Sequence, residues 1–396
     1  MSSLVTPPLS LYIHLPWCVR KCPYCDFNSY AVRDALPEAA YVEALARDIE
    51  SQAVEVSGRP IVSIFFGGGT PSLFTPEAIG RVLEAARRHL TVAPDAEVTL
   101  EANPGTIERG RFTGYREAGV NRVSLGAQSF DADQLKALGR IHSPQETTRA
   151  ADELHAAGLT NFNLDLMYAL PGQDVAGAVR DIEQALSLQP AHLSHYQLTL
   201  EPGTQFAANP PSLPADDLAA DMLSACHEHL ARAGFSRYET SAYARPGRQC
   251  RHNLNYWTFG DYLGVGAGAH GKLTDTASAT IVRTTQQREP RRYLAMSPRA
   301  SARQPIAARD LPFEFMMNAL RLTEGFERAS FSERTGLDWN VVQRNFDVFQ
   351  SRGLVVVDGE TCRPTPFGVR FVNEMLVGLL PESAISSGKH AMSMGS

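Results

Sequence analysis

A strand, loop and helix pattern repeats six times in the first 240 residues of the chain. Each repeat opens with a short apolar or β-branched run, followed by a loop rich in Gly, Pro or Asn and then by an amphipathic helical pattern. The predicted strands are Leu11–Leu15, Ile61–Phe66, Glu97–Leu100, Arg122–Leu125, Phe162–Met167 and Leu193–Leu198. The predicted helices cover residues 37–56, 76–90, 107–118, 145–158, 174–187 and 215–233. This order predicts parallel strands that are joined by right-handed crossovers.

A doubly wound sheet and a barrel both satisfy this order. The conspicuous sequences follow the predicted strands directly: HLPWCVRKCPYC, GGGTPS, EANPGT, GAQSF, YALPGQ and LEPGT. In a barrel, the loops after parallel strands converge on one mouth, whereas a doubly wound sheet gathers its ligand at a single switch point. The pattern therefore predicts an α/β chain with a partial (β/α)6 barrel.

The periodicity changes after residue 240. Residues 241–307 are rich in aromatic residues and Gly, and we expect a loop-rich extension that ends in an arginine-rich linker. In residues 308–380, helices near 311–322, 329–335 and 339–351, strands 353–357 and 361–365 and a helix at 366–379 match the order of a winged helix. The tail, 381–396, is rich in Ser and Gly and is expected to fray. The predicted domains are thus a barrel core at 1–240, the extension, a winged-helix-like domain and the tail.

The composition agrees with a globular chain of more than one domain: 396 residues, 43% hydrophobic and 20% charged. A net charge of −6 argues against a protein that coats nucleic acid. No apolar run is long enough for a membrane span, and the first residues lack a basic leader. We therefore expect a cytoplasmic protein, for which peripheral contact with the inner face of the membrane stays open.

Three of the six cysteines, Cys18, Cys22 and Cys25, lie within eight residues in the loop after the first strand. A zinc site requires a fourth local ligand, which this loop lacks. A redox pair of Cys22 and Cys25 leaves Cys18 without a role. An iron–sulfur cube that is held by three thiolates uses all three and leaves one iron open to bind a small molecule.

The sequence CVRKCPYC resembles the CxxxCxxC signature of radical S-adenosylmethionine (SAM) enzymes, and Phe65–Pro71 resembles their glycine motif. A phosphate-binding loop is excluded because no Lys-Ser/Thr follows these glycines. Over nearly the whole chain, the resemblance narrows to the oxygen-independent coproporphyrinogen III oxidase-like group, and within it to a heme chaperone branch. It implies the radical SAM form of the barrel, a [4Fe–4S] cluster on the three cysteines, and SAM at the open iron.

The resemblance also implies a SAM site at the ends of successive strands. The residues predicted to bind SAM are Tyr12, Phe27, Gly68, Gly69, Thr70, Glu101, Gln128, Arg140 and Asp165. Carboxylate, amide and guanidinium groups suit the sulfonium, amino acid head and hydroxyl groups of SAM better than they suit a phosphate ligand. Considered singly, each of two residues also has a structural explanation. Asp165 would pair with a neighbouring polar group on its strand, and Arg140 would cap a helix.

Two features separate the chaperone branch from the oxidases. The oxidases carry a further cysteine two residues after the third cluster cysteine, where this chain has Phe27. The sequence CRHNLNYW, Cys250–Trp257, resembles the HNxxYW motif of the chaperone branch, for which heme binding is proposed. Because imidazole is a common axial ligand of heme iron, His252 is the candidate ligand, with Cys250 and His270 as alternatives. Without the resemblance, a structural role of His252 in a Gly-rich loop would be the better explanation.

The resemblance implies a heme chaperone that binds a [4Fe–4S] cluster, SAM and heme and delivers heme to respiratory heme proteins. The alternative is an oxygen-independent coproporphyrinogen III oxidase, which decarboxylates porphyrinogen propionates by means of a 5′-deoxyadenosyl radical. Phe27 argues against this enzyme.

A surface for heme propionates or anionic lipid is a further hypothesis, although such a charge run is more often a solvated linker. The residues concerned are Arg283, Arg288, Arg291, Arg292, Arg299 and Arg303.

Overall fold

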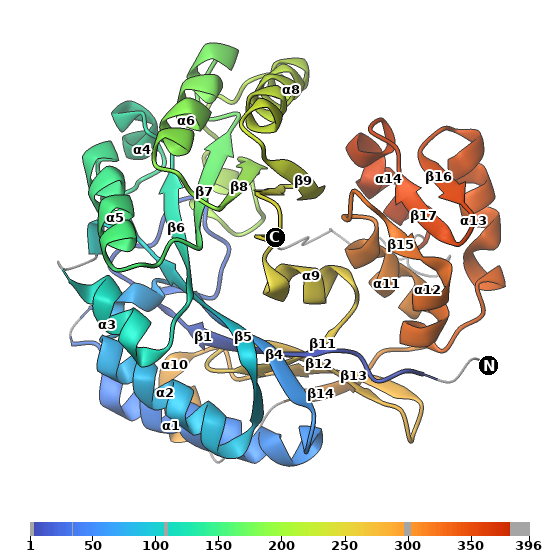
Figure 1. The fold of residues 1–396 in the computed structure, drawn as a ribbon, viewed down its shortest axis with the longest axis horizontal. Coiled ribbons are helices and arrows are strands. Elements are labelled where there is room, and N and C mark those ends of the chain that lie inside the picture. Colours follow the sequence, from blue (N-terminus) through green and yellow to red (C-terminus); the bar gives the residue numbers. More distant parts are fainter. Residues whose placement is uncertain (1–3, 34, 107–109, 297–301, 381–396) are drawn as a thin grey trace.

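The computed structural model describes residues 4–33, 35–106, 110–296 and 302–380 of the chain. Figure 1 shows a larger part, in which a curved sheet carries helices on its outer face, and a smaller part formed by the C-terminal residues. The large sheet has twelve strands in the order β14-β13-β12-β11-β1-β4-β5-β6-β7-β8-β10-β9.

Six neighbouring parallel strands form the centre of this sheet in the order in which they occur along the chain. They are β1 (Leu9–Leu15), β4 (Pro60–Gly68), β5 (Thr91–Ala102), β6 (Arg122–Gln128), β7 (Phe162–Tyr168) and β8 (His192–Gln197). The helices that follow them in turn are α1 (Glu38–Ala53), α2 (Pro76–His89), α3 (Arg111–Ala118), α5 (Pro144–Ala156), α6 (Val175–Ser187) and α8 (Asp216–Arg232). Sequential parallel order without reversal is that of a barrel, so the predicted fold class is confirmed.

Apolar and polar side chains alternate along the parallel strands, as they do in β1. Leu9, Leu11 and Ile13 are fully buried in the core under the helices, whereas Ser10 faces into the barrel and bonds to Ser63 of β4 at 2.7 Å. Successive side chains of a strand point to opposite faces, so the inward positions form a column of polar groups. Its members include Ser10, Tyr12, Ser63, Glu97, Arg122, Ser124, Asn163, Asp165 and His192.

Both edges of the barrel are extended by further strands. Beyond β1 lie β11 (Asp261–Val265), which is parallel to it, and then the antiparallel strands β12 (His270–Asp275), β13 (Thr280–Thr285) and β14 (Ala302–Pro305). Beyond β8 lie β10 (Ala242–Ala244) and β9 (Ser236–Glu239). Two short helices, α9 (Arg251–Trp257) and α10 (Pro290–Ala295), complete this region.

Residues 241–307 therefore differ from the loop-rich extension expected from the sequence, because five of their strands belong to the large sheet. The strand signal was hidden by buried charges. Asp261 and Lys272 are almost fully enclosed and pair at 2.8 Å, and Arg59 reaches the same carboxylate at 2.9 Å. An apolar pattern cannot reveal strands whose buried positions hold an ion pair.

The described C-terminal part contains four α-helices and a three-stranded sheet, in the order predicted for a winged helix. Its elements are α11 (Leu311–Ala319), β15 (Phe326–Glu327), α12 (Arg328–Thr335), α13 (Asn340–Ser351), β16 (Val355–Asp358), β17 (Thr361–Pro364) and α14 (Val372–Val377). Phe315 lies in its core and packs edge-on against Phe259 from outside residues 308–380, with ring centroids 5.7 Å apart. The predicted tail, 381–396, lies outside the described residues, and none of the described helices is long and apolar enough to cross a bilayer.

Candidate functional site

The loop that carries the three cysteines follows β1 and is held in place by several contacts. Its ends pair as two short parallel strands, β2 (Trp17–Cys18) and β3 (Tyr30–Ala31). The amide of Asn28 donates hydrogen bonds to the carbonyls of Ala267 and Arg288, both at 2.9 Å. The cysteine loop is thereby fastened to the turn after β11, at the mouth to which the carboxyl ends of the parallel strands point.

The three cysteines of this loop are free thiols, of which Cys18 is buried and the other two are partly exposed. Burial raises the pKa of Cys18 and of Cys25, and neighbouring thiols add to the rise. In the part of the chain that the structure describes, no three His, Cys, Asp or Glu side chains converge as a single metal ion would require. The irons of a [4Fe–4S] cluster occupy separate corners, so three thiolates around one loop suit a cluster.

Arg140 connects the cysteine loop to the end of β6. One guanidinium nitrogen donates to the carbonyl of Gly126 at 2.8 Å, and another lies 3.8 Å from the sulfur of Cys22. A cavity of about 330 Å³ is lined by Arg20, Lys136 and Arg140 together with residues 141–144, and none of the three cysteines lines it. Arg140 is therefore placed to face a ligand beside the cysteines.

Gln128 ends β6 in the left-handed backbone region, with φ at 66°, where the register of β6 and β7 shifts. A non-glycine residue in this region stores strain of about 1 kcal/mol or more, and such positions cluster at functional sites. The side-chain oxygen of Gln128 accepts a hydrogen bond from the hydroxyl of Tyr196 at 2.8 Å. The side chain of Gln128 therefore points from this strained turn towards Tyr196 on the inner wall of the barrel.

The glycine motif closes tightly against the chain that leaves β1. A Cβ on Gly68, where φ is 114°, would lie 2.4 Å from the His14 ring, and a Cβ on Gly69 would lie 2.5 Å from the Trp17 carbonyl. The amide of Thr70 donates to the same Trp17 carbonyl at 2.7 Å. These contacts within the chain already exclude side chains at both glycines, whether or not a ligand approaches their backbone.

Two largely enclosed carboxyl groups, those of Glu101 on β5 and Asp165 on β7, face into the barrel. Burial, followed by the charge of Asp165, raises the pKa of Glu101 to about 8. Burial also raises the pKa of Asp165, against hydrogen bonds from Asn163 at 2.7 Å and Ser124 at 3.1 Å. Glu101 accepts a hydrogen bond from the amide of Gly68 at 3.1 Å, and no described residue forms an ion pair with it.

These carboxyl groups lack a full complement of positive charge from the protein, and a bound cation would stabilise their ionised form. SAM carries a sulfonium and an ammonium group, so the residues present fit SAM. Burial, followed by the charge of Glu101, raises the pKa of Tyr12 well above its usual range. The structure thus brings together eight of the nine predicted SAM residues. The exception is Phe27, whose side chain is 44% exposed on the cysteine loop.

The predicted heme ligands differ in their access to solvent. His252 on α9 is only 2% exposed, and its ring nitrogens lie 3.1 Å from the hydroxyls of Ser63 and Tyr256. Burial, together with the charge of Arg122, lowers the pKa of His252 to about 3. Cys250 is buried too, whereas His270 is exposed at the start of β12. Neither His252 nor Cys250 is open to a ligand in this conformation.

The arginine-rich stretch is partly paired within the chain. Arg283 bonds to Glu314 of the C-terminal domain, and Arg303 bonds to Glu55. Arg288, Arg291 and Arg292 are exposed, and Arg299 lies outside the described residues.

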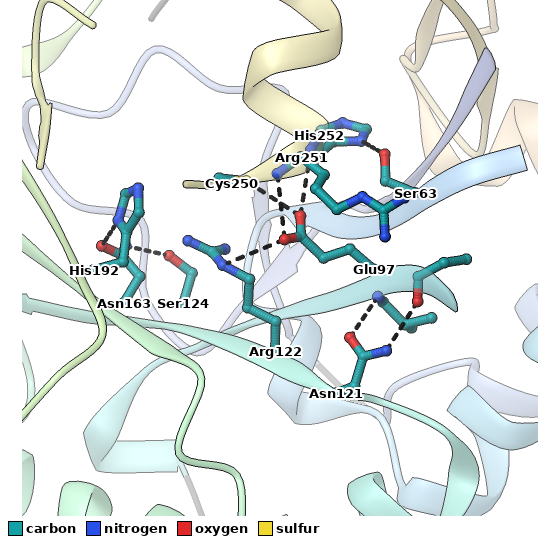
Figure 2. A network of polar contacts seen from close by, with 12 residues as sticks. Ser63, Glu97, Asn121, Arg122, Ser124, Asn163, His192, Cys250, Arg251 and His252 are labelled. Atoms are coloured by element: carbon teal, nitrogen blue, oxygen red, sulfur yellow. Dashed lines mark hydrogen bonds and ion pairs between the residues drawn. The ribbon is translucent and has the colours of Figure 1, made fainter. Parts of the chain in front are cut away.

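Sequence reasoning missed the polar column below the mouth. Figure 2 shows that Glu97 and Arg122 lie between α9 and the residues around Asn163. The signal that could have revealed them is the regular alternation of polar residues within the predicted strands.

Comparisons with known proteins agree with this geometry. The model of the radical SAM superfamily matches residues 12–185, and that of the HemN C-terminal domain matches residues 306–371. Coproporphyrinogen III oxidase (HemN) from Escherichia coli has the same fold, with a TM-score of 0.80 and 22% identity over 94% of this chain and 90% of that one. The fold and the three cysteines define a radical SAM protein.

Relatives with 45% identity or more define the branch. The chain is 49% identical to the heme chaperone HemW of Escherichia coli strain K12, over 95% of this chain and 99% of that protein. It is 45% identical to the heme chaperone HemW of Haemophilus influenzae, over 95% and 99% of the two chains. The chain belongs to the HemW family of radical SAM proteins. A [4Fe–4S] cluster and SAM are the cofactors that the superfamily implies.

Proposed function

We propose that this protein is a heme chaperone that binds heme and delivers it to respiratory heme proteins. The observation that carries the proposal is the likeness to two proteins named as heme chaperones, which extends over 95% of the chain. Position 27 supports it, because an exposed phenylalanine stands where the related oxidases have a further cysteine. The likeness to the oxidase HemN, at 22% identity, concerns the fold alone.

The cofactor site in this proposal is assembled from the cysteine loop and the strand ends. Cys18, Cys22 and Cys25 hold the cluster, while Glu101 and Asp165 face the positive groups of SAM. When bound, this pair of cofactors supplies one-electron cleavage of SAM. The predicted contributions of the chain are to hold SAM against the open iron and to enclose it with Gln128, Arg140 and the glycine turn.

His252 is the proposed axial ligand of heme, and the exposed His270 is its alternative. Imidazole binds heme iron in its neutral form, which is the form that the low pKa of His252 favours at neutral pH. Because both ring nitrogens of His252 are already hydrogen-bonded, coordination requires α9 to move.

A heme titration followed by Soret absorbance tests the proposal. The wild type should bind heme, and His252→Ala should bind it more weakly with a shifted Soret maximum. His229→Ala on α8 serves as the control, because its imidazole is partly exposed and lies 3.8 Å from the exposed Glu183 carboxylate. A wild-type protein that does not bind heme would refute the proposed function. Full heme affinity in His252→Ala, together with a loss of heme affinity in His270→Ala, would identify His270 as the heme ligand instead.

A second assay separates the chaperone from the enzyme. Reconstituted protein is incubated anaerobically with a reductant, SAM and coproporphyrinogen III. We expect no protoporphyrinogen. Its formation over many turnovers per chain would show that the protein is the decarboxylase and would refute the chaperone assignment.

We also propose a cytoplasmic location with peripheral contact to the inner face of the membrane. Arg291 and Arg292, both exposed, supply positive charge for anionic lipid or for heme propionates. Neutralising both arginines should weaken binding to vesicles that contain anionic lipid. Unchanged vesicle binding and heme affinity would remove this surface from the proposal.

A further inference from the structure

The helix that carries His252 is held by a residue from the barrel wall. Glu97 of β5 accepts hydrogen bonds from the backbone amides of Arg251 at 3.2 Å and His252 at 3.3 Å, and from the thiol of Cys250 at 3.5 Å. The N-cap residue Cys250 makes no side-chain cap of its own. The first amides of a helix require an acceptor, so Glu97 takes the role of the missing cap. Figure 2 shows its carboxylate directly below the start of α9.

Arg122 is the counterion of this carboxylate. Its Nε lies 4.0 Å from Glu97, and its side chain is 2% exposed. No described residue accepts a hydrogen bond from that nitrogen. A buried ion pair with such loose geometry contributes little to stability, because desolvation of the two charges offsets their attraction. The pair therefore needs an explanation other than stability, and its contacts with α9 supply one.

Along the face of α9 that lies over the barrel, the side chain of His252 holds the helix. The imidazole stacks on Phe65 of β4 with ring centroids 4.8 Å apart, and it bonds to Ser63 at 3.1 Å. The helix is thus fixed at its start by Glu97 and along its inner face by the ring of His252. Breaking the hydrogen bonds between Glu97 and the start of α9 is the step that would free the imidazole of His252 to bind a ligand.

We propose that Glu97, with Arg122 as its counterion, is a positioning residue that latches α9 over the barrel and sets how readily His252 reaches heme iron. This inference rests on the proposed function and names the groups that control its heme site. If only the released conformation binds heme, the apparent dissociation constant is the intrinsic constant divided by the population of that conformation. A weaker latch should therefore tighten heme binding, whereas the loss of a merely structural contact should not.

Glu97→Asp is the main variant. It keeps the negative charge opposite Arg122 but is shorter by one methylene group, so it cannot reach all three donors. Asp95→Asn is the matched control, because Asp95 is two residues away on the same strand and contacts Arg251 at 3.2 Å in an exposed ion pair. If Glu97→Asp does not fold, the double variant E97Q/R122M removes both charges of this ion pair together.

Two measurements are made on the cluster-loaded protein. Hydrogen exchange of residues 251–257 should be on the order of tenfold faster in Glu97→Asp than in the wild type or Asp95→Asn, whereas exchange in α2 should be unchanged. The dissociation constant of heme, from the Soret titration, should fall by a similar factor, which corresponds to about 1.4 kcal/mol. Adding His252→Ala to Glu97→Asp should abolish this gain.

The outcomes are distinct. Unchanged exchange in α9 would show that Glu97 is not a latch. Faster exchange with unchanged or weaker heme binding would show that the latch does not govern access to His252, and either result overturns the inference. Absence of heme binding in the wild type and in every variant would refute the proposed function instead, and the exchange rates would still decide whether Glu97 holds α9.

Discussion

The buried carboxyl group of Glu101 allows a quantitative test of the predicted SAM site. With its pKa raised to about 8, roughly nine in ten of these groups carry a proton at pH 7. The sulfonium and ammonium groups of SAM are stabilised by the ionised form. We therefore expect the binding of SAM at pH 7 to release about 0.9 proton from Glu101.

The same ionisation controls the affinity. When only the ionised site binds, the apparent dissociation constant contains the factor 1 + 10^(pKa − pH), which is roughly 11 at pH 7 and roughly 1.3 at pH 8.5. The contribution of Glu101 is thus about an eightfold gain in SAM affinity between these two pH values. In the absence of SAM, the pH dependence of folding stability has the opposite sign to the pH dependence of SAM affinity. The folded state holds the extra proton, so the free energy of unfolding falls as the pH rises from 4.5 towards 8.

Calorimetric titration of the reconstituted protein with SAM, in two buffers that differ in ionisation enthalpy, measures the released proton. Glu101→Gln should lose the proton release and flatten the pH dependence, and the remaining slope reports the amino group of SAM itself. Glu228→Gln, at an exposed position on α8, is the control. Equal proton release in the wild type and in Glu101→Gln would refute the placement of Glu101 beside the positive groups of SAM.

Three further substitutions probe the cluster, the glycine turn and the buried ion pair. Cys22→Ser should reduce the iron content after anaerobic reconstitution from roughly four per chain and abolish the charge-transfer absorption. Gly69→Ala should lower the free energy of unfolding by about 1–3 kcal/mol in urea, because its Cβ would meet the Trp17 carbonyl at 2.5 Å. Lys272→Met should cost about 1.5–3 kcal/mol in the same assay, since it removes one of the two cationic partners of the fully buried Asp261 and leaves Arg59 in place.

Each of these three substitutions has a matched control variant. Cys226→Ser should keep the iron, and an iron content unchanged in Cys22→Ser would remove that residue from the cluster. Gly172→Ala is the turn control, because a Cβ there meets no atom within 4 Å although its φ of 71° adds strain. A loss at Gly69 no larger than the loss at Gly172 would contradict the predicted clash with the Trp17 carbonyl. Arg232→Ala breaks an exposed ion pair and should cost less than about 1 kcal/mol, and a similarly small loss in Lys272→Met would contradict the argument from burial.

The parallel strands and the mouth could be predicted because their signals are local. Each short apolar run is followed by a loop and a helix, and six such repeats leave few arrangements of the chain. The three cysteines within eight residues likewise reveal a cluster site without any knowledge of the fold. The strands β11 and β12 escaped prediction because their buried positions hold Asp261 and Lys272, which neutralise each other inside the sheet across a hairpin that the local pattern does not show.

The sequence by itself determined the barrel, the cysteine loop and the types of residue that end each strand. The tertiary structure alone decided the environment of those residues. Glu101 and Asp165 are 64 positions apart in the chain, yet the charge of Asp165 raises the pKa of Glu101 because the fold brings their strands into one enclosed region. His252, a plausible open ligand by its motif, is sealed between Ser63, Phe65 and Tyr256. A motif specifies which groups are available, whereas burial and hydrogen bonding determine whether those groups are charged and whether a ligand can reach them.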